Sequence, residues 1–283
     1  MDRYGRNRWV DVSSGGPESV HWWIEKDDWV HVSQTNGSLT GDGKKDVRVY
    51  VSIDWDYLDT LEEKPNEARI AFKSSDSANT NVTIPLSYAR SPPSSFKGTV
   101  EGDGYVAIEA AHHTAISRSL AGPTSEWAEI TYFGRTHSGM TLLPPCRQSF
   151  DLDASPTLTY SIWFTTLPPS HIKITLYLSP ALNLVNGKRL AIGVSVDDSD
   201  PVAVYPVPES KAGTLPSDWE TVVSDEIRLV DVTLKLDKRE DGAHEIVLWG
   251  MTSGVVVERV VVDLGGVKAR GHSYLGPPES LIM

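Results

Sequence analysis

Strict alternation of apolar and polar side chains is the sequence feature that most constrains how this chain can fold. Every odd position from Val47 to Trp55 carries an apolar side chain. Neighbouring side chains on a strand point to opposite faces, so this pattern predicts a strand with one buried and one solvated face. Helical periodicity is weak throughout, with one turn expected within Leu58–Lys64. The chain is therefore predicted to be an all-β protein, because the alternation recurs at residues 82–88, 158–164, 172–178, 190–196 and 246–248.

A short proline-containing segment, Arg90–Ser95, separates two sets of alternating strands. We predict an immunoglobulin-like β-sandwich over residues 1–95 and a jelly-roll β-sandwich over residues 96–283. The two prolines of the segment Arg90–Ser95 lack a backbone N–H and stiffen it. The segment is too short to act as a free linker. In the second domain the apolar phase slips by one residue at Leu229–Val230, which is typical of a β-bulge.

Composition and charge exclude several classes of partner. The 283 residues carry 38 acidic and 26 basic side chains, for a net charge of −12. Nucleic acid is not an expected partner, because phosphate binding needs clustered Lys and Arg. No run of 18 apolar residues predicts a membrane span, and the first residues lack the apolar segment of a signal peptide. The single cysteine, Cys146, allows no intrachain disulfide and leaves the cellular compartment open.

The sequence contains no complete catalytic motif. Glu109 precedes the pair His112-His113, but adjacent strand residues point to opposite faces, so we expect one buried and one exposed histidine instead of a metal site. A glycosidase needs two carboxylates that face each other across a sugar, and nothing selects such a pair here. The acidic run Asp197–Asp200 closes a strand and is predicted to be a solvated turn.

Tryptophan side chains are the candidates for contact with sugars, because an aromatic face stacks on a sugar ring. The chain has nine of them. Trp163 and Trp249 lie out of phase with their apolar strand neighbours, so we predict that these two are exposed and bind carbohydrate. The alternative for either tryptophan is that it packs against the first domain.

An ordered set of short motifs in the second half resembles a known family. The set includes Gly104–Ala110, Gly134-Arg135-Thr136, Met140–Pro144 and the terminal octapeptide Ser273–Ser280. Together these motifs resemble the C-terminal region of glycoside hydrolase family 115, the xylan α-1,2-glucuronidases. The first half resembles the segment that precedes this module. In that family the catalytic centre lies in upstream domains that this sequence does not include.

The resemblance implies a non-catalytic ancillary region of an α-glucuronidase-like enzyme, which supports domain packing, dimerisation or substrate presentation. The implied partners are the upstream catalytic domains, a second copy in a homodimer, and plant xylan or another polysaccharide. The implied location is extracellular. The alternative is a stand-alone carbohydrate-binding module for glucuronoxylan or another uronic-acid-bearing polysaccharide. Whether the chain alone has enzymatic activity is left open.

The resemblance also extends to individual residues. Arg135 and Tyr274 join the two tryptophans as carbohydrate-binding candidates. The Arg135 guanidinium can form two hydrogen bonds with a carboxylate, either of a uronic acid or of the upstream domains. The alternative for Arg135 is a structural contact within its own domain. The module further resembles carbohydrate-binding modules of families 6 and 35, in which a Glu-Ala-Glu strand helps to hold structural calcium. Here Glu109 is kept but Ala111 replaces the second glutamate, so no cofactor is predicted and the calcium site is in doubt.

Overall fold

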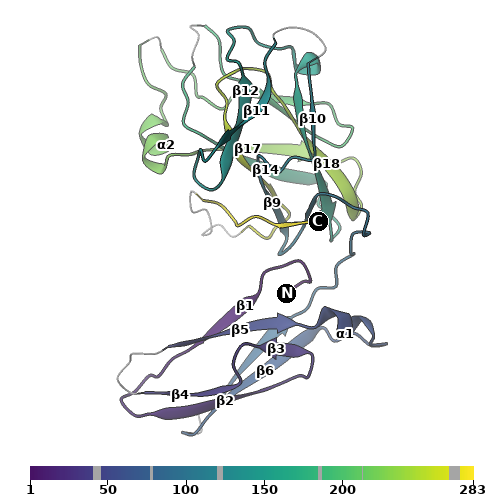
Figure 1. Ribbon diagram of the computed structural model, residues 1–283, viewed down its shortest axis with the longest axis vertical. Helices are drawn as coiled ribbons and strands as arrows, with labels where there is room; N and C mark the ends of the chain where they lie inside the picture. The colour runs from purple at the N-terminus through teal and green to yellow at the C-terminus, as the bar shows by residue number, and fades with distance from the viewer. Residues whose placement is uncertain (41–45, 77–78, 120–123, 184–186, 212, 268–274) are drawn as a thin grey trace. The chain divides into compact units, whose positions relative to one another are not determined.

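Nearly all regular secondary structure in the computed structural model is β-strand, which confirms the predicted fold class (Figure 1). Its contacts divide the chain into two compact units, Met1–Ala89 and Arg90–Met283. None of the helices among the described residues is long and apolar enough to cross a membrane. The structure describes residues 1–40, 46–76, 79–119, 124–183, 187–211, 213–267 and 275–283.

Residues 90–95, which the sequence analysis placed in the first domain, are attached to the second unit. The backbone N–H of Arg90 donates to the carbonyl of Thr165 at 3.2 Å, and its guanidinium donates to the carbonyl of Asp241 at 3.0 Å. The ring of Phe96 then packs edge-on against Trp163 with 5.4 Å between centroids. The prolines indicated a boundary near these residues, but not the contacts that attach them to the second unit.

The described residues of the first unit form two antiparallel sheets and one short helix. The helix α1 (Trp55–Asp59) begins at Asp54, whose carboxylate accepts a hydrogen bond from the N–H of Tyr57 at 2.9 Å. It starts before the turn expected from the sequence. The immunoglobulin-like assignment stays a prediction. One sheet has the order β1-β5-β3 and the other β4-β2-β6-β7, with β1 Arg8–Val12, β2 Val20–Lys26, β3 Val30–Val32, β4 Asn36–Leu39, β5 Val47–Ile53, β6 Glu67–Ser74 and β7 Thr80–Pro85.

Alternation along β5 places its side chains as the sequence predicts. Val49, Val51 and Ile53 are buried in the core of the first unit, whereas Arg48 and Tyr50 point to solvent. The inward face packs on residues of the opposite sheet within one apolar cluster. The outward face of the β1-β5-β3 sheet is consequently free to carry polar and aromatic groups.

The second unit is a larger sandwich of two sheets. The first has the order β16-β15-β18-β13-β8-β20, with β10 also paired to β13. The second has the order β11-β12-β19-β14-β17, with β9 also paired to β19. The elements are β8 Thr99–Val100, β9 Tyr105–Glu109, β10 Ala115–Ser117, β11 Glu126–Thr131, β12 Ser138–Leu143, the 3₁₀ turn Leu152–Ala154, β13 Thr157–Phe164, β14 His171–Leu178, β15 Ile192–Val196, β16 Val202–Val204, α2 Trp219–Asp225, β17 Arg228–Lys235, β18 Gly242–Trp249, β19 Val257–Asp263 and β20 Leu281–Ile282.

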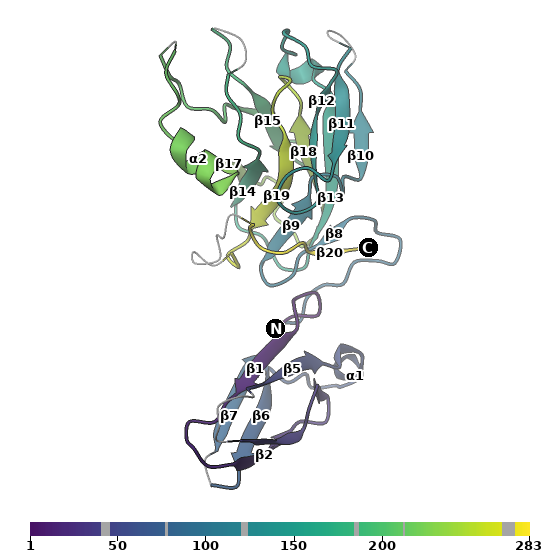
Figure 2. The ribbon, with the colours of Figure 1, turned by 60° about the vertical axis from the view of Figure 1, so that its left-hand side comes forward.

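Both sheets contribute to the core of the second unit. Tyr160 and Phe164 on β13 are buried in the same cluster as Ile174 and Leu176 on β14. The end of the chain returns to this unit's beginning, since β20 pairs with β8 (Figure 2). The last residues are thereby held beside β9, the strand that follows β8.

The β-bulge predicted at Leu229–Val230 is wrong. Strand β17 pairs with β14 in unbroken register along its whole length. Arg228 takes the inward position and forms a two-pronged contact with Asp218, at 2.9 and 3.1 Å, while Leu229 is exposed. The shift of register lies instead between β14 and β19, at Tyr177–Leu178. Arg228 occupies a core position and Leu229 a surface position. The apolar residues alone therefore give the pattern of a phase slip although the strand is regular.

Candidate functional site

A buried ion pair joins β9 to β19 in the second unit. Glu109 and Arg259 are partners across these two antiparallel strands. The Arg259 Nη2 group donates to Oε1 of Glu109, and the Thr136 hydroxyl donates to Oε2 at 2.7 Å. The side chains of both charged residues are more than nine-tenths buried, at 7% and 6% exposure. Buried opposite charges are tolerated when their remaining polar atoms are also bonded. Both carboxylate oxygens of Glu109 are bonded here, whereas Nε of Arg259 has no hydrogen-bond partner among the described residues.

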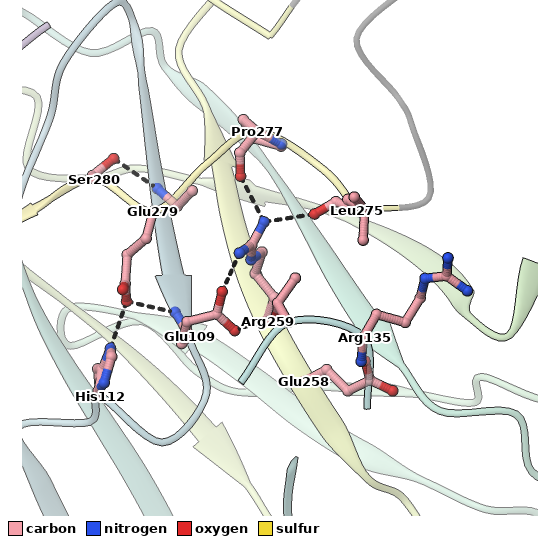
Figure 3. A network of polar contacts seen from close by, with 11 residues as sticks. Glu109, His112, Arg135, Glu258, Arg259, Leu275, Pro277, Glu279 and Ser280 are labelled. Carbon is pink, nitrogen blue, oxygen red and sulfur yellow. Dashed lines mark hydrogen bonds and ion pairs between the residues drawn. The ribbon is translucent and has the colours of Figure 1, made fainter. Parts of the chain in front are cut away.

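The same arginine fastens the C-terminal segment to the sandwich (Figure 3). Its Nη1 group donates to the carbonyls of Leu275 and Pro277 at 2.6 and 2.7 Å. Ser280 then pairs with Ala107 on β9: the Ser280 N–H donates to the Ala107 carbonyl at 2.9 Å, and the Ala107 N–H donates to Oγ at 3.0 Å. We call residues 275–280 the strap. It includes most of the terminal octapeptide that was matched as a motif.

Glu279 connects the strap to the histidine region. Its Oε1 accepts the backbone N–H of Glu109 at 3.0 Å and contacts Nδ1 of His112 at 2.6 Å. The His112 ring lies 5.0 Å from that of His137, centroid to centroid. His113 is half-buried as well, so the expected split into one buried and one exposed histidine is wrong.

Glu258 supports the loop between β11 and β12. Its Oε2 accepts the backbone N–H of Arg135 at 2.9 Å, and its Oε1 accepts the Ser179 hydroxyl at 2.6 Å. The Arg135 guanidinium donates to the carbonyl of Asp225 at 2.6 Å and contacts Glu226 at 3.3 Å. Arg135 therefore makes the structural contact within its own domain that was the alternative to a carbohydrate-binding role.

The calcium site implied by the resemblance does not fit these residues. Both oxygens of Glu109 are bonded to Arg259 and Thr136, and Ala111 has no side-chain oxygen to offer. Calcium takes six to eight oxygen ligands. Across the described ranges, no group of three His, Cys, Asp or Glu side chains is placed to hold a metal ion. The positive charge beside Glu109 is supplied by the Arg259 guanidinium.

The two tryptophans predicted to bind carbohydrate do not come together. Trp163 is only 6% exposed and its indole N–H donates to the Arg90 carbonyl at 2.9 Å, so its predicted exposure is wrong. Trp249 is half-buried and donates to the Ser195 hydroxyl at 3.0 Å. The two lie at opposite ends of the β13–β18 pair. Tyr274 lies outside the described residues.

The central residues of this network, Glu258 and Arg259, were not among the predicted site residues. Glu258 and Arg259 are two adjacent charges within the otherwise apolar run Val255–Val262. A central strand with both faces buried has no solvated side, so a charge there requires a partner. Two adjacent charges in an apolar strand therefore indicate buried polar contacts, and this pattern could have identified the network from the sequence.

A second buried polar contact lies outside the network. His244 on β18 is buried, and its Nδ1 and Nε2 lie 2.8 Å from the Asp197 carboxylate and 2.9 Å from the Glu240 carbonyl. Burial alone would lower the pKa of His244, but the bonds to these two acceptors outweigh it and raise the pKa above its ordinary value. Asp197 therefore holds a buried imidazole as well as closing a solvated turn.

The fold and the network define an all-β protein. In it, Glu109 links β9 to β19 and Glu279 links the strap to β9. The sequence of residues 98–279 matches the glycosyl hydrolase family 115 C-terminal domain, so the chain belongs to this family. No curated protein matches the chain.

Among solved structures, a family 115 4-O-methyl-alpha-glucuronidase with specificity for decorated arabinogalactans is similar at 16% identity and a TM-score of 0.39. The similarity covers 63% of this chain and only 19% of that enzyme. The C-terminal family 6 carbohydrate-binding module of a laminarinase from Zobellia galactanivorans matches at 9% identity and a TM-score of 0.34, over 56% of this chain and 98% of the module. A family 35 carbohydrate-binding module from Clostridium thermocellum matches at 12% identity and a TM-score of 0.32, over 56% and 97%.

Proposed function

We propose that the chain is a non-catalytic ancillary region of an α-glucuronidase-like enzyme, which packs against catalytic domains or a second copy and helps to present polysaccharide. The family match to a C-terminal domain over residues 98–279 carries this proposal. The geometry supports it, because Glu109 and Glu258 are each bonded at both carboxylate oxygens. Buried acids committed in this way cannot act as the acid and nucleophile, or acid and base, of glycoside hydrolysis.

An exposed aromatic loop supports the packing role. Tyr132, at the tip between β11 and β12, is 99% exposed and has a φ of 56°, a backbone conformation that a bulky residue rarely adopts. Phe133 beside it is 40% exposed. The next residues are anchored, since Glu258 accepts the Arg135 N–H and Glu109 accepts the Thr136 hydroxyl. The network thus holds two aromatic rings toward solvent on a rigid base, as expected of a docking contact.

Hydrolysis assays test the non-catalytic part of the proposal. The purified chain is incubated with glucuronoxylan and with arabinogalactan, and released 4-O-methylglucuronic acid is measured beside an active family 115 glucuronidase. We expect release by that enzyme and none by this chain. Release that scales with the concentration of this chain would refute the proposal.

The packing role is tested by association. Analytical ultracentrifugation of the chain alone measures self-association. The same measurement on a mixture with the catalytic domains of a family 115 glucuronidase measures association with those domains. We expect a complex in one of these samples, and we expect the double substitution Tyr132→Ser, Phe133→Ser to weaken it. Leu215→Ser, at another exposed apolar residue, is the matched control. A chain that stays monomeric in both samples contradicts the packing role.

A stand-alone carbohydrate-binding module is the second candidate. The observation that favours it is a pair of exposed aromatic rings on the first unit, at Trp9 and Tyr50. Binding of saccharides by the isolated chain, without association with catalytic domains, would favour this alternative.

A further inference from the structure

Two aromatic side chains lie next to each other on the outward face of the β1-β5-β3 sheet. Trp9 on β1 and Tyr50 on β5 are direct cross-strand partners, at 53% and 51% exposure. Residues paired in this way have Cβ atoms about 5 Å apart on the same face. The sheet therefore presents two adjacent rings to solvent, while Val49 and Val51 on its other face fill the core. Trp9, which was not among the tryptophans predicted to be exposed, is more exposed than Trp23, at 37%.

Polar side chains lie on both sides of this aromatic pair. On one side, Asp11 and Arg48 are cross-strand partners that form a two-pronged ion pair at 2.7 and 2.9 Å. On the other side, Ser52 is paired with His31, whose side chain is 60% exposed. These groups offer hydroxyl, imidazole, carboxylate and guanidinium partners around the two rings.

The ion pair also fixes the aromatic centre. The guanidinium carbon of Arg48 lies 4.9 Å from the centroid of the Trp9 ring, within the range of a cation–π contact. Because Asp11 holds the other side of Arg48, the guanidinium cannot swing away without losing both partners. A ring held in place before binding loses less conformational entropy when a ligand stacks on it.

The charge and size of this face narrow the choice of ligand. Arg48 is neutralised by Asp11 and the whole chain carries −12, so an anionic polymer is disfavoured. Three strands about 4.8 Å apart make a face about 10 Å wide. Two rings on such a face supply far less than the about 800 Å² per partner that a stable protein interface buries. The ligand should therefore be uncharged and narrow, with apolar faces that stack on the two rings and hydroxyl groups that bond to the polar side chains around them.

We infer that the Trp9–Tyr50 face is a binding platform for a neutral saccharide chain. Consecutive sugar rings stack their C–H faces on Trp9 and Tyr50, and their hydroxyl groups bond to Asp11, Arg48 and His31. The platform lies outside residues 98–279, so it is separate from the family 115 C-terminal domain. The platform rests on the carbohydrate-binding candidate proposed above and names its ligand class. It makes no use of Tyr132, so it stands or falls independently of the packing role.

Calorimetric titration of the full chain with xylohexaose, cellohexaose and a β-1,3-linked galactohexaose tests the platform. We expect weak binding of at least one of these neutral oligosaccharides. Trp9→Ala with Tyr50→Ala should weaken that binding by about tenfold or more, equivalent to about 1.4 kcal/mol. Both side chains are half exposed, so unchanged melting temperatures would show that the variant is folded.

Trp23→Ala is the matched control, since Trp23 is an exposed tryptophan on the other sheet of the same unit. It should bind as the unmodified chain does. Binding that survives in the Trp9/Tyr50 variant would overturn the platform and place the saccharide site elsewhere in the chain. Binding lost equally in the Trp23 variant, or no binding of any of the three probes, would overturn it too. None of these results bears on whether the chain hydrolyses glucuronoxylan.

Discussion

At the scale of single residues, Arg259 is the group on which most of the polar network depends. Replacing it with methionine keeps much of its volume but leaves the Glu109 carboxylate buried without its counter-charge. Breaking one side of a buried ion pair costs about 3–5 kcal/mol. We therefore expect Arg259→Met to lower the free energy of unfolding of the second unit by that order, measured by urea denaturation.

The matched control is an exposed ion pair. In the same unit, Arg118 and Glu126 contact each other at 2.7 Å, with side chains that are 80% and 47% exposed. Surface pairs contribute about 0–1 kcal/mol, so Arg118→Met should change the stability of the second unit little. Adding Glu109→Gln to Arg259→Met should restore part of the loss, because it removes the unpaired charge. Equal effects of Arg259→Met and Arg118→Met would contradict the expected dependence of the network on Arg259.

His244 links stability to pH. Its pKa is raised in the folded state by Asp197 and the Glu240 carbonyl, against the opposing effect of burial. A raised pKa contributes stability that is fully present below the unfolded value of about 6.5 and is lost as the pH rises through the folded value. The stability difference between the unmodified chain and His244→Gln should therefore shrink as the pH rises above about 6.5. Melting curves at a series of pH values measure it, and a difference that grows with pH would refute the assignment.

At the scale of elements, the loop from β11 to β12 depends on a glycine. Gly134 has a φ of 87°, and a Cβ atom there would lie 2.5 Å from the carboxyl carbon of Glu258. Gly134→Ala therefore combines an unfavourable backbone conformation with displacement of a buried carboxylate. We expect a loss of about 1–3 kcal/mol in thermal or urea unfolding. Gly187→Ala, also at positive φ but with no atom within 4 Å of the added Cβ, should cost less.

Strand positions were predictable from sequence, whereas the roles of out-of-phase residues were not. Alternation in β5 identified the buried faces of Val49 and Val51, because only apolar side chains fit there. The same logic failed for Trp163, which is buried although it is out of phase with its neighbours. On a strand whose two faces are both covered, phase no longer separates core from surface. The β-bulge prediction beside Arg228 was wrong because a charged side chain with an ion-pair partner occupies a core position there.

At the scale of the whole molecule, the candidate sites depend on contacts between distant parts of the sequence. Arg259 meets Glu109 across 150 positions, and Glu279 meets His112 across 167. No local pattern reports such pairs, so the motif comparison located the strap region without indicating what it holds. The Trp9–Tyr50 pair likewise appears only once β1 and β5 are placed in register. The sequence therefore predicted the fold class, whereas the long-range pairs that build the candidate sites appear only in the structure.

Calcium should not raise the melting temperature of the whole chain through Glu109. Arg259 already supplies the positive charge beside Glu109, and a cation at that carboxylate would have to displace it. A ligand that binds only the folded state raises the melting temperature with its concentration. We therefore expect the same melting temperature in excess calcium and in excess EDTA, with a calcium-dependent family 35 carbohydrate-binding module as the positive control. A rise with calcium that disappears in Glu109→Gln would show that the carboxylate binds the cation after all.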